Sequence, residues 1–268
     1  MKLNLTISKK GILAYLGEFL ATALLAFFLY TSPMLAGGIQ PFVVAFVFMA
    51  IWYIFSPITK VHMNPIVTLG EYLVNLIRQL VEKKFVLNDL LNFFGYLAVQ
   101  FLAFLAVFPL ASWVRWEYAG FMLEKNGYGD TASVKEQYLA GFVFGNSYVD
   151  KFSSLAFFLE FFIAFMFVFT FLRVASSEKY KQYLGFIWGL VVFTIIIIAT
   201  SLTGASFNPW RSLVAAMLEG GTALTQIGLY ILAPFSGAIV AALLHSAFQW
   251  FTTPSVKKAA VESKPKAK

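Results

Sequence analysis

Two Asn-Pro dipeptides, Asn64-Pro65 and Asn208-Pro209, are the parts of this 268-residue chain best suited to act on another molecule. Asparagine is among the best N-caps, and proline is tolerated at the first helical position, where a missing N–H costs no hydrogen bond. Each dipeptide therefore predicts the start of a helix. The side-chain amide of each asparagine can also donate a hydrogen bond to the oxygen of a small neutral molecule.

The two dipeptides lie at matching places in an internal repeat. Glu18 precedes Asn64 by 46 positions, and Glu160 precedes Asn208 by 48 positions, each glutamate lying in an otherwise apolar run. One isolated Asn-Pro dipeptide would most simply be an ordinary helix start. Two copies, each at a similar distance from a glutamate in an apolar run, instead favour a repeated functional unit.

The elements that carry these residues are predicted to be membrane helices. The chain is 60% hydrophobic and only 12% charged, well below the charge content of a soluble domain. A helical span takes about 20 apolar residues. Six such runs are present, at residues 11–31, 38–57, 90–111, 153–173, 183–202 and 226–250. Three spans per half reverse the orientation of the second copy, so we predict an all-α membrane protein with six transmembrane helices and an inverted repeat.

The helices behind the two Asn-Pro dipeptides are predicted to be re-entrant. Their apolar stretches are too short to cross a bilayer, so each should enter from one face and end near the middle, where the two N-termini meet. Facing N-termini would place positive partial charge there. That charge opposes cations and hydronium and acts little on neutral molecules. Unwound backbone at membrane depth is tolerated where it lines a wet cavity, so the pattern favours a pore.

The repeat sets the predicted domain boundaries. We expect one channel domain, a joining extracellular loop without an assigned role, and two cytoplasmic ends, the second of them basic. The predicted ranges are 1–10 for the N-terminus, 11–251 for the channel domain, about 11–111 and about 153–251 for the two repeats, about 112–152 for the loop, and 252–268 for the tail.

Charge placement predicts the orientation in the membrane. The formal net charge is +7, and all but five of the 20 Lys and Arg residues lie in segments on the side of the two termini. Because cytoplasmic loops carry the excess of basic residues, both termini should be cytoplasmic, in a multi-pass protein of the cell membrane. The basic tail is better suited to anionic lipid than to nucleic acid.

Several function classes have no support in the sequence. The chain has no cysteine, which excludes disulfides, thiolate catalysis and thiolate metal sites. Its two histidines, His62 and His245, are too far apart in sequence to suggest a metal cluster. No enzyme chemistry is visible, and we expect no metal or other cofactor.

Taken in chain order, the motifs resemble those of the aquaporins, or major intrinsic proteins. The residues that carry the resemblance are Gly17-Glu18-Phe19, His62-Met63-Asn64-Pro65, Gln100, Glu160 and the run from Thr203 to Ser212. The resemblance covers residues 11–251 and implies a passive water channel that excludes protons and ions and forms a homotetramer with one pore per subunit. Glycerol or another small neutral solute is the alternative permeant. A structural membrane protein with a closed pore is the alternative of another class.

The resemblance also implies a selectivity filter. Its walls would be Arg211, Ile196, Ala205 and, from the second span, either Val44 or Phe46. An arginine three positions after an asparagine lies on the next helical turn, can donate to a permeant oxygen and repels cations. Its alternative is to extend toward lipid headgroups. The aliphatic Ile196 and the small Ala205 favour a somewhat wide and weakly polar constriction.

The pore centre departs from the family pattern at one position in each repeat. The implied central residues are Asn64, Asn208, Pro65, Pro209, Ile66 and Trp210, and the last two replace the usual alanines. We expect the capping residues to preserve both half-helices. Trp210 is bulky enough to shift one of them, so the sequence leaves open whether it and Ile66 narrow or close the pore.

The remaining polar residues of the motifs are expected to support the loops. Glu18 and Glu160 are costly in a membrane without partners. They could carry protons, but their repeat positions favour a structural role as acceptors for backbone N–H groups. His62 would either line the cytoplasmic vestibule or brace its loop, and Gln100 is grouped with these structural residues.

Overall fold

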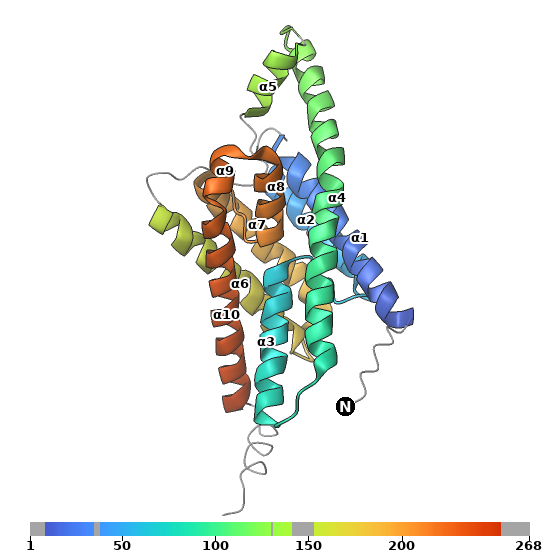
Figure 1. The fold of residues 1–268 in the computed structure, drawn as a ribbon, viewed down its shortest axis with the longest axis vertical. Helices are drawn as coiled ribbons and strands as arrows, with labels where there is room; N and C mark the ends of the chain where they lie inside the picture. The colour runs from blue at the N-terminus through green and yellow to red at the C-terminus, as the bar shows by residue number, and fades with distance from the viewer. Residues whose placement is uncertain (1–8, 35–37, 130, 141–152, 253–268) are drawn as a thin grey trace, which may run out of the picture.

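The structure is a computed structural model that describes residues 9–34, 38–129, 131–140 and 153–252, and within these ranges it is all helical (Figure 1). The helices are α1 (Lys9–Thr31), α2 (Gln40–Phe55), α3 (Pro65–Val81), α4 (Leu87–Lys125), α5 (Ala132–Ala140), α6 (Ser153–Ala175), α7 (Leu184–Thr203), α8 (Pro209–Glu219), α9 (Gly221–Thr225) and α10 (Ile227–Thr252), with short 3₁₀ turns at Ser32–Met34 and Lys181–Tyr183.

The predicted membrane architecture is confirmed. Five helices, α1, α4, α6, α7 and α10, are long and apolar enough to cross a membrane, and the 16-residue α2 is a shorter apolar helix. Many large apolar side chains point outward from the bundle, among them Phe158, Ile197 and Leu243. So large an exposed apolar surface is unfavourable in water, whereas the hydrocarbon chains of lipid cover it.

The repeat is visible in how the helices pack. α1 packs on α4 as α6 packs on α10, and α2 packs on α7 across the repeat boundary. The approach of α10 to α6 requires glycine, because a Cβ at Gly237 would lie 2.3 Å from the carbonyl oxygen of Phe161. Small residues at such a crossing allow the backbones of membrane helices to touch.

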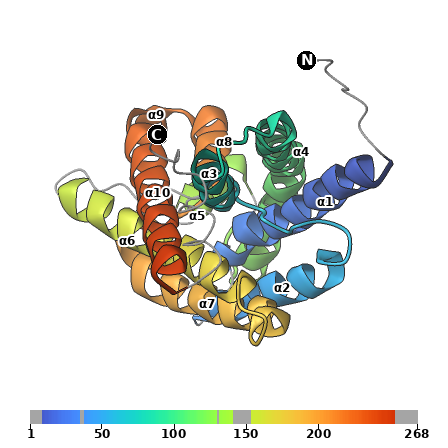
Figure 2. The ribbon, with the colours of Figure 1, turned by 90° about the horizontal axis from the view of Figure 1, so that it is seen from below.

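The half-helices α3 and α8 lie one above the other in the interior of the bundle. Figure 1 shows α8 above α3, between α4 and α10. Seen from below in Figure 2, α3 lies between α10 and α4. The two short helices therefore enter from opposite ends, as an inverted repeat requires.

α4 differs from its predicted bounds. It was expected to end near residue 111, yet it continues to Lys125 and is followed by α5. The extension buries one face at a spacing of four residues, at Ala111, Arg115, Ala119 and Leu123. The predicted loop is thus helical at 112–125 and 132–140, and residues 141–152 lie outside the described part. The N-terminal residues 1–8 and the basic tail after Thr252 also lie outside it.

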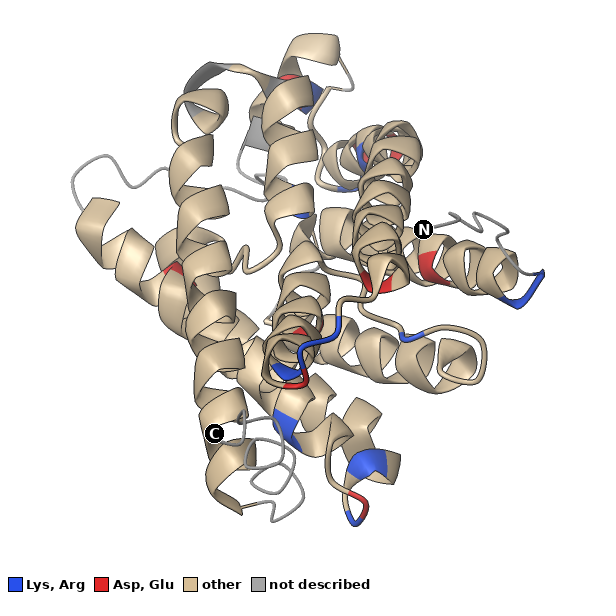
Figure 3. Ribbon diagram, turned by 60° about the horizontal axis from the view of Figure 1, so that its bottom comes forward, with Lys and Arg blue, Asp and Glu red and all other residues tan. Residues whose placement is uncertain are grey.

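The two described ends of the chain lie at the same end of the molecule, where α1 begins and α10 ends (Figure 1). Figure 3 turns that end toward the viewer and shows Lys and Arg residues, drawn in blue, in the chain connections there. By chain order, the connections there carry Lys60, Lys83, Lys84, Lys179 and Lys181. The α4 extension and α5 project from the other end.

Candidate functional site

Each half-helix begins with an asparagine that caps it. The Asn64 Oδ1 accepts a hydrogen bond from the Ile66 N–H at 3.1 Å. The Asn208 Oδ1 accepts from the Trp210 and Arg211 N–H groups at 3.2 and 3.4 Å. Proline occupies the next position in both helices, where no N–H is needed. The prolines therefore start the helices. Neither of them lines the cavity described below.

The two helix N-termini are tied to each other at the centre of the molecule. The Asn64 Nδ2 donates to the Phe207 carbonyl at 2.9 Å, and the Asn208 Nδ2 donates to the Met63 carbonyl at 3.1 Å. An amide carries two N–H donors, so each asparagine keeps one for a solute beside the bond to the facing loop. The facing N-termini concentrate positive partial charge at this point.

The loops ahead of the half-helices adopt the same strained backbone. Val61 and Met63 have φ of 53°, and their counterparts Ala205 and Phe207 have φ of 47° and 31°. These residues occupy the left-handed region, which costs a non-glycine residue about 1 to 3 kcal/mol. Such strain persists only where the surroundings fix the backbone.

Glu18 fixes the first loop. Its carboxylate is fully buried and accepts hydrogen bonds from the backbone N–H groups of His62 and Met63 at 3.2 and 2.5 Å. The Thr59 hydroxyl donates to it at 3.0 Å, and the Gln100 Nε2 donates at 2.9 Å. Four donors surround this carboxylate, which satisfies a charge that would otherwise be costly to bury.

Glu160 holds the second loop in the same way. Its carboxylate accepts from the N–H groups of Ser206 and Phe207 at 3.0 and 2.8 Å and from the Thr203 hydroxyl at 2.6 Å. Thr59 was not among the residues singled out from the sequence, and Thr203 appeared there only as part of a longer motif. Each lies five positions before its asparagine, a signal that the repeat alignment contains.

A small cavity of about 10 Å³ lies beside the two asparagines. Its walls come from α1, α2, α6, α7 and both loops, through Leu25, Leu29, Val44, Phe48, Met63, Asn64, Phe167, Val192, Phe207 and Asn208. A cavity of this size holds about one water molecule. In the second span, Val44 lines this central cavity, whereas Phe46 is 63% exposed on the outside of the bundle.

Trp210 and Ile66 do not line this cavity. The Trp210 Nε1 donates to the Leu97 carbonyl at 3.0 Å, and its ring packs edge-on against Phe101 at 5.5 Å. The bulk of Trp210 is thus directed at α4. Ile66 is fully buried in the hydrophobic core.

Arg211 lies close to the second loop. It is 5% exposed, and its Nη1 donates to the carbonyls of Ala205 and Gly204 at 2.7 and 3.3 Å. Tyr30 of α1 donates to the Arg211 carbonyl at 3.1 Å. Ile196 is buried on α7 in the same hydrophobic cluster as Ala205. The structure thus brings together Arg211 and Ala205, and it buries the guanidinium among protein groups rather than at a lipid-facing surface.

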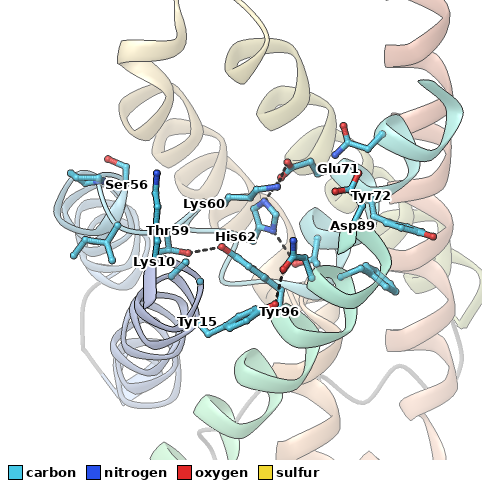
Figure 4. A pocket seen from close by; sticks show the side chains of 18 residues that line it. Lys10, Tyr15, Ser56, Thr59, Lys60, His62, Glu71, Tyr72, Asp89 and Tyr96 are labelled. Atoms are coloured by element: carbon cyan, nitrogen blue, oxygen red, sulfur yellow. Dashed lines mark hydrogen bonds and ion pairs between the residues drawn. The ribbon is translucent and has the colours of Figure 1, made fainter. Parts of the chain in front are cut away.

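His62 belongs to a polar cluster that lines the pocket shown in Figure 4. Its Nδ1 is 3.1 Å from the Thr68 hydroxyl, and its Nε2 is 2.5 Å from a carboxylate oxygen of Glu71, which also pairs with Lys60. Glu71 lies on α3, which does not cross the membrane. Burial opposes its ionisation, but His62 and Lys60 outweigh this and lower the pKa of Glu71 to about 2.

This cluster separates two pockets. One, of about 340 Å³, opens among α1, α3 and α4 and is the pocket of Figure 4. The other, of about 710 Å³, opens among α2, α3, α6, α7 and α10. Lys60 and Glu71 line both. The larger pocket shares α2, α6 and α7 with the central cavity, and His245 lines it. Within the described residues, no group of three or more His, Cys, Asp or Glu side chains could hold a metal.

Comparison with known proteins agrees with this geometry. A sequence profile of the major intrinsic proteins matches residues 6–245. Aquaporin Z of Rhodopseudomonas palustris is 24% identical over 244 residues, which cover 86% of this chain and 91% of that protein. The glycerol uptake facilitator protein-like 6 of Lactiplantibacillus plantarum is 42% identical over 91 residues, a match that spans 34% of this chain and 42% of that protein.

The fold is likewise shared with a solved channel. The aquaglyceroporin from Plasmodium falciparum superposes with a TM-score of 0.63 at 18% identity, covering 92% of this chain and 99% of that one. The sequence profile spans most of the chain, and the paired half-helices supply the matching architecture. The chain therefore belongs to the major intrinsic protein family, whose members are membrane channels and not enzymes.

Proposed function

We propose that the protein conducts water passively and excludes protons and other ions. The observation that carries this proposal is the pair of reciprocal bonds by which Asn64 and Asn208 join the two half-helix N-termini beside a cavity of one water's size. A water molecule there would accept hydrogen bonds from both amides, which occupies the oxygen lone pairs that proton transfer along a chain of waters requires. The positive ends of both helices oppose cations at the same point.

Arg211 adds a second barrier to cations. Its guanidinium is always protonated, lies beside the loop ahead of Asn208 and is held by two backbone carbonyls. A cation would have to lose water close to this fixed charge, whereas a neutral molecule would not be repelled. Val44, Ile196 and Ala205 are the filter walls that we propose beside it.

Glycerol or another small neutral solute is the second candidate permeant. Two observations favour it: the aliphatic and small side chains proposed for the filter, and the 42% identity to a glycerol uptake facilitator-like protein over 91 residues.

Flux measurements on purified protein in liposomes test the proposal. Stopped-flow light scattering with an impermeant osmolyte should show water flux with a low activation energy, and a pH-sensitive dye inside the vesicles should show no added proton flux. The same vesicles in a glycerol gradient separate the two permeants. Arg211→Val should reject cations less well, because it removes the fixed charge. Water flux equal to that of empty liposomes would contradict the channel proposal.

We also propose that the basic end of the molecule faces the cytoplasm of a cell membrane, because cytoplasmic loops are enriched in Lys and Arg. The resemblance to aquaporins further leads us to propose a homotetramer with one pore per subunit. Its protein mass in detergent would be four times that of the single chain.

A further inference from the structure

We propose that a ring of three phenylalanines at the centre of the pathway, and not the filter around Arg211, limits the size of the solute. The ring consists of Phe48, Phe167 and Phe207 and is called the central phenylalanine ring below. This inference rests on the proposed function as a channel. It restricts the permeant to molecules no wider than a single water, which means water rather than glycerol.

The three side chains meet although they come from three different elements. Phe48 lies on α2, Phe167 on α6 and Phe207 in the loop before α8, and all are at most 5% exposed. The ring centroids of Phe48 and Phe167 are 5.9 Å apart, and those of Phe167 and Phe207 are 5.0 Å apart. All three line the cavity of about 10 Å³ together with both asparagines. Three aromatic side chains and two amides thus line a space with room for about one water.

The central phenylalanine ring is backed by Trp188 of α7. The indole stacks on Phe167 at 4.6 Å and meets Phe48 edge-on at 4.9 Å. Its Nε1 donates to the Phe167 carbonyl at 3.0 Å, which anchors the indole to the helix that it supports. Trp188 is itself fully buried. The space into which Phe48 or Phe167 would have to rotate is therefore occupied.

The third member is fixed through its backbone. The Phe207 N–H donates to Glu160, and its carbonyl accepts from Asn64. With both backbone groups bonded and φ at 31°, the residue cannot swing away without breaking the contact between the half-helices. The constriction is therefore a built part of the fold.

The proposed filter carries much less bulk. Beside Arg211, its proposed walls are the aliphatic Ile196 and the methyl group of Ala205, and it shares Val44 with the central cavity. Because three benzene rings are bulkier than these side chains, we expect the narrower opening at the centre. Glycerol, with three carbons and three hydroxyls, would have to desolvate against these rings with only two amides to bond it. Size exclusion therefore belongs to the centre.

Phe48→Leu and Phe207→Leu test the inference. Both replacements remain apolar and remove part of the ring, so each should raise glycerol flux by about tenfold or more while water flux changes less. Phe169→Leu is the matched control, because Phe169 also lies on α6 in an aromatic stack, with Phe165, but does not line the cavity. Its glycerol flux should equal that of the wild type. Elution as a single species and an unchanged melting temperature show that each variant is folded.

The outcomes separate this inference from the proposed function. Wild-type water flux with unchanged glycerol flux in both ring variants overturns the inference, and a gain in glycerol flux on Ala205→Gly alone would place the limit at the filter instead. If the wild type conducts no water, the proposed function fails. In that case new water flux in a ring variant would still identify the ring as the limiting constriction, and its absence would overturn that as well.

Discussion

At the scale of single residues, the sequence identifies the groups with hydrogen-bonding roles better than the side chains that set the width of the central cavity. Asn64 and Asn208 could be recognised because capping and the repeat both restrict their type. Phe48 and Phe167 could not, because the chain has 31 phenylalanines and an apolar ring in an apolar helix has no distinguishing neighbour. Which of Val44 and Phe46 faces the interior depends on the rotation of the helix, since positions two apart differ by about 200° around its axis.

Glu160→Gln should destabilise the protein without creating a proton pathway. The carboxylate takes three donors on two oxygens, whereas a glutamine amide offers one acceptor oxygen and directs an NH₂ at a loop N–H. Leaving a buried donor without an acceptor costs about 1 to 3 kcal/mol, which thermal unfolding in detergent would detect. Glu178→Gln, at a side chain that is 89% exposed, is the control and should be neutral. A fully stable Glu160→Gln protein with altered proton flux would instead make this residue a proton carrier.

At the scale of elements, the positions of the helices could be predicted from the lengths of the apolar runs, whereas the end of α4 could not. α4 was expected to stop where charged and aromatic residues begin, but an established helix adds residues at little cost when they have reasonable helical propensity. The buried face through Arg115 and Ala119 then holds the extension in place. Hydropathy reports where lipid ends, and it does not report where the helical hydrogen bonding ends.

Trp210→Ala tests how the second half-helix is attached to its surroundings. The indole bonds the Leu97 carbonyl and packs on Phe101, so its removal should lower the free energy of unfolding by up to about 3 kcal/mol. Water flux per folded protein should stay the same, because the side chain points at α4 and away from the central cavity. Flux and unfolding would be measured on the same preparation. A large rise in water flux would show that Trp210 restricts the pathway after all.

At the scale of the whole molecule, the inverted repeat was predictable because its two glutamates and two asparagines recur in order. Their spacing fixes which groups meet at the centre. It does not fix how much space remains there, since the cavity width depends on side chains from α2, α6, α7 and both loops. The repeat is therefore readable from the sequence, while the permeant depends on dimensions that only the packed structure has.

Orientation in the membrane can be tested by single cysteines, because the chain has none of its own. Ser133 lies on α5 and Lys83 lies between α3 and α4, at opposite ends of the molecule, and both are exposed. The two single variants are Ser133→Cys and Lys83→Cys. A maleimide that cannot cross membranes should label the first in intact cells and the second only after permeabilisation. The cysteine-free parent is the background control. The reverse pattern would mean that the basic end faces outward.

The length of α4 has a practical consequence for imaging. Its 39 residues span about 58 Å at 1.5 Å per residue, almost twice the roughly 30 Å of a hydrocarbon core. The turn after Lys125, with Gly127 at φ of 77°, joins it to α5 at the far tip. A compact fusion partner inserted at this turn would be carried on a continuous helix, well clear of the detergent belt. It would give an otherwise featureless particle the asymmetric mass that image alignment in electron cryomicroscopy needs.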